Sequence, residues 1–154
     1  MLVFLDIDGV MVPAKSWKSP KLLSDGFPEF SDKAVRVLQN IVSGGATIML
    51  TTSHKSRFSV EEWKNIFIAR GIYVKNLGKL GDSSFGTSRR DEILNWFNLN
   101  NINEDFIIID DDKSLNALPS FLKENLILTS SMVGLNDTHL ATIKSVMEKQ
   151  AHTI

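Results

Sequence analysis

Residues 2–10 read Leu-Val-Phe-Leu-Asp-Ile-Asp-Gly-Val, and this stretch decides how the rest of the chain is understood. Its apolar start is typical of a strand buried on both faces, as in the middle of a parallel sheet. Asp6 and Asp8 come where that strand should end, and Gly9 allows the sharp turn that follows. Because ligands of open α/β sheets bind at the carboxyl ends of the strands, the two acids stand where such a fold does its chemistry.

Two carboxylates this close repel each other, and burying them is costly unless a positive group joins them. A hard divalent cation with oxygen ligands, Mg²⁺ in particular, would supply that charge. Strand-end aspartates are also common in turns and helix caps, so Asp6 and Asp8 taken alone are compatible with a purely structural role.

Composition limits the class of protein. The chain has 154 residues, of which 43% are hydrophobic and 23% charged, and this predicts a single globular domain over residues 1–154. The formal net charge of −1 gives no global attraction to nucleic acid or to anionic membranes. The absence of cysteine excludes disulfides and thiolate metal sites. No apolar run approaches the roughly 20 residues that span a bilayer, and no signal-peptide pattern opens the chain, so we expect a cytoplasmic protein.

Strand and helix patterns alternate along the chain. The expected strands are residues 2–5, 46–50, 72–74, 105–109 and 126–128. The expected helices run from Ser31 to Val42, from Ser59 to Ala69, from Arg89 to Leu99, from Leu115 to Leu118 and from Asn136 onward. This order predicts an α/β fold: three layers, Rossmann-like, with a mostly parallel sheet, helices on both faces and right-handed crossovers.

The segment 11–30 is rich in Pro, Ser, Gly and Lys and is expected to be a loop. Its aromatic residues Trp17 and Phe27 either pack on the core or belong to a flap beside the site. Lys15, Lys18 and Lys21 are ordinary solvated residues or, with Trp17, a basic rim for a nucleic-acid end.

Polar residues follow the other expected strands as well. Thr51 and Thr52 come after the second strand, and Asp110 and Asp111 come after the fourth. Each pair is common in turns, caps or solvated loops. Carboxylates for a metal and hydroxyls for phosphate oxygens, together at one edge of a sheet, form a phosphoryl-transfer set.

A cation completes this set, at the start of the helix that precedes the fourth expected strand. Arg89 and Arg90 open that helix, where arginines are more often solvated. In a phosphoryl-transfer site, a guanidinium would oppose the charge that develops on the phosphoryl group.

With these residues in place, the chain resembles the haloacid dehalogenase (HAD) superfamily in its phosphatase form. The first motif is carried by Asp6-Ile-Asp8-Gly-Val and the fourth by Asp110-Asp111. Thr51 or Thr52 resembles the second motif, and Arg89 the third, which is usually Lys. The single-domain form resembles most the HAD domains associated with RNA-repair proteins.

For three of the motifs, two neighbouring residues could fill the functional position. Thr52 is favoured over Thr51 because it stands further past the strand, and Arg90 competes with Arg89. Asp111 is favoured as the direct metal ligand, with Asp110 bridging to Arg89.

The resemblance implies an enzyme, a Mg²⁺-dependent phosphatase that hydrolyses a phosphomonoester through an aspartyl-phosphate. Asp6 would be the nucleophile and Asp8 the general acid and base. The metal set would be Asp6, Asp8, Asp110 and Asp111, with Asp8 contributing its backbone carbonyl rather than its side chain. The threonine and Arg89 would bind phosphate oxygens.

The same resemblance suggests a large substrate, because both places where HAD phosphatases carry a cap domain are short here. We expect a phosphorylated RNA or DNA end, with a small phosphorylated metabolite or a phosphoprotein as the alternative. A non-catalytic module that binds a phospho-ligand is the alternative of another class, and the intact Asp6 and Asp8 argue against it.

Other ligand classes have little support in the sequence. No Gly-rich phosphate loop follows the first strand, which argues against a nucleotide-binding domain. His54, His139 and His152 share no metal-binding spacing and are expected to be surface or loop residues.

Overall fold

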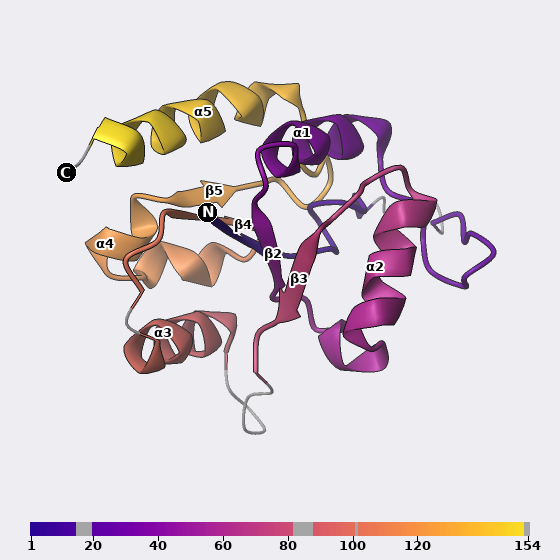
Figure 1. Ribbon diagram of the computed structural model, residues 1–154, viewed down its shortest axis with the longest axis horizontal. Helices are drawn as coiled ribbons and strands as arrows, with labels where there is room; N and C mark the ends of the chain where they lie inside the picture. Colours follow the sequence, from indigo (N-terminus) through magenta and orange to yellow (C-terminus); the bar gives the residue numbers. More distant parts are fainter. Residues whose placement is uncertain (15–19, 82–87, 101, 153–154) are drawn as a thin grey trace.

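The central feature of the computed structural model is a five-stranded sheet in the order β3-β2-β1-β4-β5, in which every neighbouring pair is parallel. The structure describes residues 1–14, 20–81, 88–100 and 102–152. The strands are β1 (Leu2–Leu5), β2 (Thr47–Leu50), β3 (Asn76–Lys79), β4 (Phe106–Asp110) and β5 (Leu126–Leu128). The predicted α/β fold with a mostly parallel sheet is therefore confirmed (Figure 1).

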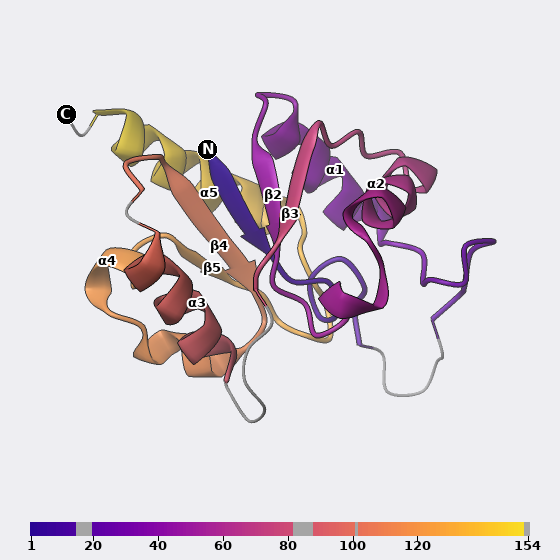
Figure 2. The same cartoon turned by 60° about the horizontal axis from the view of Figure 1, so that its bottom comes forward.

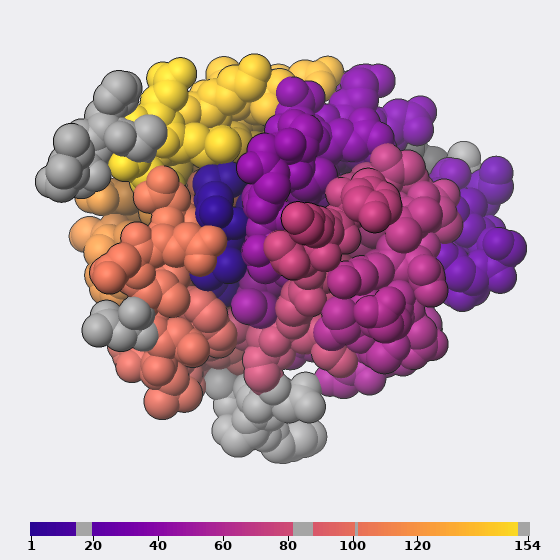
Figure 3. Space-filling model, viewed as in Figure 1, coloured from indigo at the N-terminus to yellow at the C-terminus, as the bar shows by residue number. Residues whose placement is uncertain are grey.

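β1 lies at the centre because its side chains are apolar on both faces. It pairs with β2 on one side and β4 on the other, with Leu5 opposite Leu50 and Ile109. Val3 and Leu5 enter one hydrophobic cluster, whereas Leu2 and Phe4 enter the other. In the space-filling view the start of the chain is a narrow indigo strip between the orange and purple parts of the surface (Figure 3).

Helices cover both faces of the sheet. The helices are α1 (Asp32–Val42), α2 (Val60–Ala69), α3 (Arg89–Leu99), α4 (Ser120–Lys123) and α5 (Asp137–His152), with short 3-10 turns η1 (Lys55–Arg57) and η2 (Lys113–Ala117). Residues of α1, α2 and α5 pack in one cluster with one face of the sheet, and residues of α3, η2 and α4 in the other (Figures 1 and 2). Among the described residues, no helix combines the length and apolar character needed to cross a bilayer.

Local capping explains where the helices begin. Ser31, Ser59 and Ser88 each accept a hydrogen bond from a backbone N–H in the first turn of α1, α2 and α3. At α2 the carboxylate of Glu62 also accepts the N–H of Ser59, which completes a capping box. On α3, Ile93 is buried, whereas Leu94, Trp96 and Phe97 are only partly buried.

The third strand differs from the sequence-based prediction. Residues 72–74 were expected to form it, but β3 is Asn76–Lys79. Ile72 and Val74 are buried all the same, which explains why they read as a strand. β3 has a polar sequence and is set by pairing with β2, where Gly78 lies opposite Met49. Neighbouring strands rather than intrinsic preference place this edge strand.

The loop before α1 is held on the core by one arginine. Arg70, at the end of α2, binds both carboxylate oxygens of Asp25 at 2.6 and 3.0 Å and donates to the carbonyls of Phe27 and Pro28. The Phe27 ring is buried and lies edge-on to Trp63. Phe27 is thus a packing residue.

The predicted basic rim is largely beyond what the structure describes. Lys15, Trp17 and Lys18 lie outside the described residues, and Lys21 is exposed.

Candidate active site

The carboxyl ends of β1, β2 and β4 bring the predicted site residues to one edge of the sheet. Pairing continues past the strands, because the N–H of Asp6 donates to the carbonyl of Ile109 and the N–H of Thr51 to that of Leu5. Asp110 is the last residue of β4. Figure 2 shows the arrowheads of β1 and β4 side by side at this edge. Three strand ends that are far apart in the sequence therefore meet there.

Three carboxylates form the centre of the site. One oxygen from each of Asp6, Asp110 and Asp111 lies within 4.8 Å of the others. The side chains of Asp6 and Asp110 are 5% and 0% exposed, so their charges are largely removed from water. Carboxylate oxygens are the ligands that Mg²⁺ prefers, and a buried group of acids is stable only with a neutralising cation or proton. The donor set therefore fits a hard divalent cation.

Arg89 supplies one positive charge to this cluster. Its Nη1 lies 2.7 Å from Oδ2 of Asp110 and 3.4 Å from Oδ1 of Asp6. The contact with Asp110 is the one expected from the sequence. Arg90 instead pairs with Asp91 on the exposed side of α3. Of the two arginines, only Arg89 reaches the acids.

Asp110 is held by its own hydrogen bonds. Its Oδ1 accepts the N–H groups of Asp111 and Asp112 at 2.8 and 3.0 Å, while Oδ2 accepts from Arg89. Burial raises the pKa of Asp110, and the contact with Arg89 and the backbone hydrogen bond lower it. Asp110 therefore orients the loop and the arginine, which leaves Asp6 and the partly exposed Asp111 with more freedom to bind a ligand.

Burial also raises the pKa of Asp6. Desolvation is the largest cause, the negative charge of Asp110 adds to it and Arg89 opposes it, so that the pKa rises to about 8. The single positive charge of Arg89 does not balance the negative charges of the buried Asp6 and Asp110 and the partly exposed Asp111. A divalent cation would favour the ionised form of Asp6 that a nucleophile requires.

Gly9 leaves the space that Asp111 occupies. Its φ is +79°, which favours glycine, and a Cβ placed there would overlap the Asp111 carboxylate. The carbonyl of Gly9 accepts the hydroxyl of Thr129 at 2.8 Å. The turn after β1 is thus fitted to the acidic loop after β4.

Asp8 lies away from the carboxylate cluster. Its side chain is 59% exposed, and its Oδ2 lies 2.7 Å from Nε2 of His54. His54 was expected to be an unremarkable surface or loop residue, and only the fold reveals this contact across 46 sequence positions. The side chain of Asp8 is not part of the three-carboxylate group, in keeping with a role in proton transfer rather than metal binding.

The two threonines differ in their hydrogen bonds. Oγ1 of Thr52 accepts the N–H of His54 at 3.2 Å. Oγ1 of Thr51 is buried and has no hydrogen-bond partner among the described residues. An unsatisfied buried hydroxyl is costly, so this atom is the better candidate to bind a phosphate oxygen. The structure thus favours Thr51, whereas the position along the sequence favoured Thr52.

The chain matches a known protein family over most of its length. The model of a family described as "HAD domain in Swiss Army Knife RNA repair proteins" matches residues 2–140. Neither the curated proteins nor the solved structures gave a match. The matched range includes all the site residues described above and every strand of the sheet.

Proposed function

Since the chain belongs to the family of HAD domains in Swiss Army Knife RNA repair proteins, we propose that it is a Mg²⁺-dependent phosphatase acting on phosphorylated nucleic-acid ends. The family supports phosphatase-type hydrolysis in general. The observation that supports Mg²⁺-dependent phosphatase chemistry in particular is the buried group of Asp6, Asp110 and Asp111 beside Arg89. Magnesium bound to these acids would supply positive charge that screens their repulsion from an anionic substrate.

In the first half of the proposed reaction, a carboxylate oxygen of Asp6 attacks phosphorus. The bond between phosphorus and the ester oxygen breaks as an aspartyl-phosphate forms. Asp8, at the exposed side of the turn, donates a proton to the leaving oxygen. Arg89 opposes the charge on the phosphoryl oxygens, and the free hydroxyl of Thr51 donates a hydrogen bond to one of them.

In the second half, Asp8 accepts a proton from a water molecule that attacks the phosphorus. The bond from phosphorus to Asp6 then breaks, inorganic phosphate leaves and Asp8 is protonated again. The separation of the two acids suits this division of labour, because Asp6 is buried beside Arg89 while Asp8 faces solvent.

A large substrate is supported by what flanks the site. Between β2 and α3 the described residues form η1, α2 and β3, and between β1 and α1 they form loop, so no separate cap domain appears among them. An open edge admits the end of a polymer, whereas enclosed cavities suit small molecules. A small metabolite or a phosphoprotein remains the alternative substrate.

Release of phosphate from oligonucleotides phosphorylated at either end, measured with and without Mg²⁺, tests the proposal. We expect hydrolysis that requires Mg²⁺ and is lost in Asp6→Asn. Asp105→Asn is the matched control, because Asp105 is exposed and precedes the opposite end of β4. Wild-type turnover in Asp6→Asn would overturn the nucleophile assignment. Binding of phosphorylated ends without any hydrolysis would favour the non-catalytic module.

A further inference from the structure

A cavity with two lysines in its lining lies beside the catalytic edge, on the β2–β3 side. It has a volume of about 260 Å³ and is lined by Lys55, Ser56, Lys79, Leu80 and Gly81. Lys55 is in the turn that follows β2, and Lys79 is the last residue of β3. The N–H of Leu80 donates to the carbonyl of Leu50, the residue before Thr51. The cavity is therefore next to the end of the strand that carries the phosphate-binding threonine.

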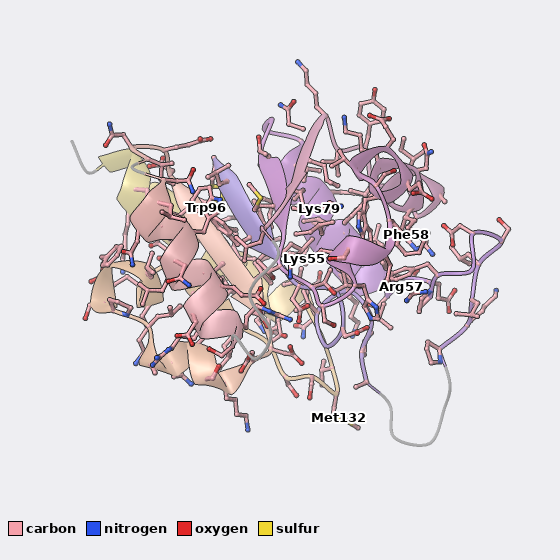
Figure 4. The ribbon with its side chains drawn as sticks, turned by 90° about the horizontal axis from the view of Figure 1, so that it is seen from below. Lys55, Arg57, Phe58, Lys79, Trp96 and Met132 are labelled. Carbon is pink, nitrogen blue, oxygen red and sulfur yellow. The ribbon has the colours of Figure 1, made fainter. Side chains whose placement is uncertain are left out.

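The two lysines are fixed by the fold. Nζ of Lys55 lies 3.3 Å from Oε2 of Glu92, and the Lys55 side chain is only 8% exposed. Nζ of Lys79 donates to the carbonyl of Phe58 at 3.1 Å. An ammonium has three N–H donors, so each of these hydrogen bonds leaves others that can face a ligand. Figure 4, which looks onto this edge, shows Lys55 and Lys79 close together near its middle.

Among the described residues that line the cavity, two carry a positive charge, Lys55 and Lys79, and none is an acid. Two described acids that interact with these lysines are engaged elsewhere as well: Glu92 pairs with Lys55, and Glu62 caps α2. A cavity of this size is below the range of pockets for drug-sized ligands, so it suits a single anionic group rather than a whole nucleoside. A Cβ added at Gly81 would meet no atom of the described residues within 4 Å, its chain neighbours aside.

Helix α3 connects the surroundings of the cavity with those of the catalytic cluster. Glu92, the partner of Lys55, is three positions after Arg89 on α3, and residues at that spacing lie on the same face of a helix. β3 is two strands from β1 in the sheet, which is about 10 Å. An anion bound near Lys79 would thus lie about as far from a phosphate at Asp6 as neighbouring groups of a polymer lie from each other.

We propose that this cavity binds the phosphodiester next to the terminal phosphate of a nucleic-acid strand. The inference rests on the proposed function and deepens it, because it makes the site select a strand over a lone phosphate ester. Every nucleotide of a strand adds one phosphate, so a strand always offers a second anion beside the one that is removed. Lys79 and Lys55 would contribute the donors for that anion.

The contact between Lys79 and the adjacent phosphodiester is tested by comparing wild type and Lys79→Gln on two substrates. The substrates are an end-phosphorylated oligonucleotide and the same molecule with an uncharged methylphosphonate at the adjacent linkage. We expect Lys79→Gln to raise KM about tenfold on the charged oligonucleotide and to leave KM for the methylphosphonate substrate unchanged. The salt slope of oligonucleotide binding should fall by about 0.7 in Lys79→Gln.

Two further variants separate the charge from its place in the fold. Lys75 is an exposed lysine directly before β3, at the end of the strand opposite Lys79. Lys75→Gln should therefore leave KM unchanged. Lys79→Arg keeps a cation and should restore most of the affinity. Equal effects of Lys75→Gln and Lys79→Gln, or equal effects of Lys79→Gln on both substrates, would overturn the inference.

The ligand class is tested with a nucleoside 3′,5′-bisphosphate. A dependence on Lys79 as large as that of the oligonucleotide would assign the cavity to small bisphosphates and overturn the assignment to a strand. Failure of the proposed function is a separate outcome. In that case no phosphate ester is hydrolysed by the wild-type protein, while the binding measurements still decide whether Lys79 contacts the adjacent linkage.

Discussion

Nε2 of His54 lies 2.7 Å from Oδ2 of Asp8, while Nδ1 of the same ring lies 3.2 Å from a guanidinium nitrogen of Arg57. A guanidinium only donates hydrogen bonds, so Nδ1 is an acceptor and the ring proton is on Nε2. His54 therefore donates to Asp8. The ring is also held edge-on by Phe27, at 5.8 Å between centroids. The fold thus orients the acid that is exposed to solvent.

The leaving group provides a test of this orientation. We expect His54→Ala to slow hydrolysis of an alkyl phosphate about tenfold more than that of p-nitrophenyl phosphate, because only the alkoxide needs a well-placed proton donor. His54→Gln keeps an N–H within reach of Asp8 and should recover part of the loss. Equal losses on both substrates, measured as kcat, would indicate a structural role for His54.

Magnesium binding should release a proton. The pKa of Asp6 is raised to about 8 by burial and by Asp110, so at pH 7 much of the carboxyl is protonated without a cation. Binding of Mg²⁺ requires the ionised form, so affinity should rise with pH up to about 8 and level off above it. Calorimetry in buffers of different ionisation enthalpy measures the proton release.

The proton release has its own control. Asp6→Asn removes the titrating group and should abolish the release. A release that is unchanged in Asp6→Asn would assign the proton to another group.

Gly9 is expected to be essential for metal binding, and Gly26 provides a matched control. Both have positive φ, +79° and +77°, but a Cβ at Gly26 would meet no atom within 4 Å, whereas one at Gly9 would overlap Asp111. Gly26→Ala should cost about 1 kcal/mol of unfolding free energy from backbone strain alone and keep the Mg²⁺-dependent rise in Tm. Gly9→Ala should lose that rise as well, measured by thermal unfolding. Equal Mg²⁺ responses of the two variants would contradict this account of Gly9.

Acid should weaken the loop before α1 through Asp25. The hydrogen bonds from Arg70 lower the pKa of Asp25, so the ion pair contributes stability above the unfolded-state pKa near 4 and loses it as the pH falls through the lowered value. Asp25→Asn should cost about 2 kcal/mol at neutral pH. The difference from wild type should shrink below about pH 4 in denaturant unfolding.

Glu29→Gln is the control for Asp25, since Glu29 is exposed in the same loop. It should leave both the stability and its pH dependence unchanged. A gap between wild type and Asp25→Asn that stays constant down to low pH would show that the ion pair is not the source of the stability.

The sequence predicted best what depends on local pattern. The apolar run before Asp6 identifies the central strand, and the serine caps with following acids identify the starts of α1 and α2. The contact between Arg89 and Asp110 was expected as well, since the end of one strand and the start of one helix place both groups. The strand and the caps are encoded within a few residues, and the contact of Arg89 with Asp110 joins two such local features across 21 positions.

What the sequence missed depends on partners that are distant along the chain. β3 is polar and is a strand only because β2 lies beside it. The contact of His54 with Asp8, the free hydroxyl of Thr51 and the closeness of Lys55 to Lys79 all depend on how strand ends are arranged in space. The position past the strand favoured Thr52, and it misled because the two threonines differ in a hydrogen bond that only Thr52 makes.

The central position of β1 has a consequence for how the protein would lose activity on heating. Asp6 is anchored to Ile109 by its own backbone and follows a strand with no exposed edge, so its amide should be among the slowest to exchange with deuterium. Asp8, two residues later, is on a turn at the surface. The boundary between the rigid interior and the yielding surface thus runs between the two acids. Inactivation by local loosening at Asp8 should therefore precede global unfolding.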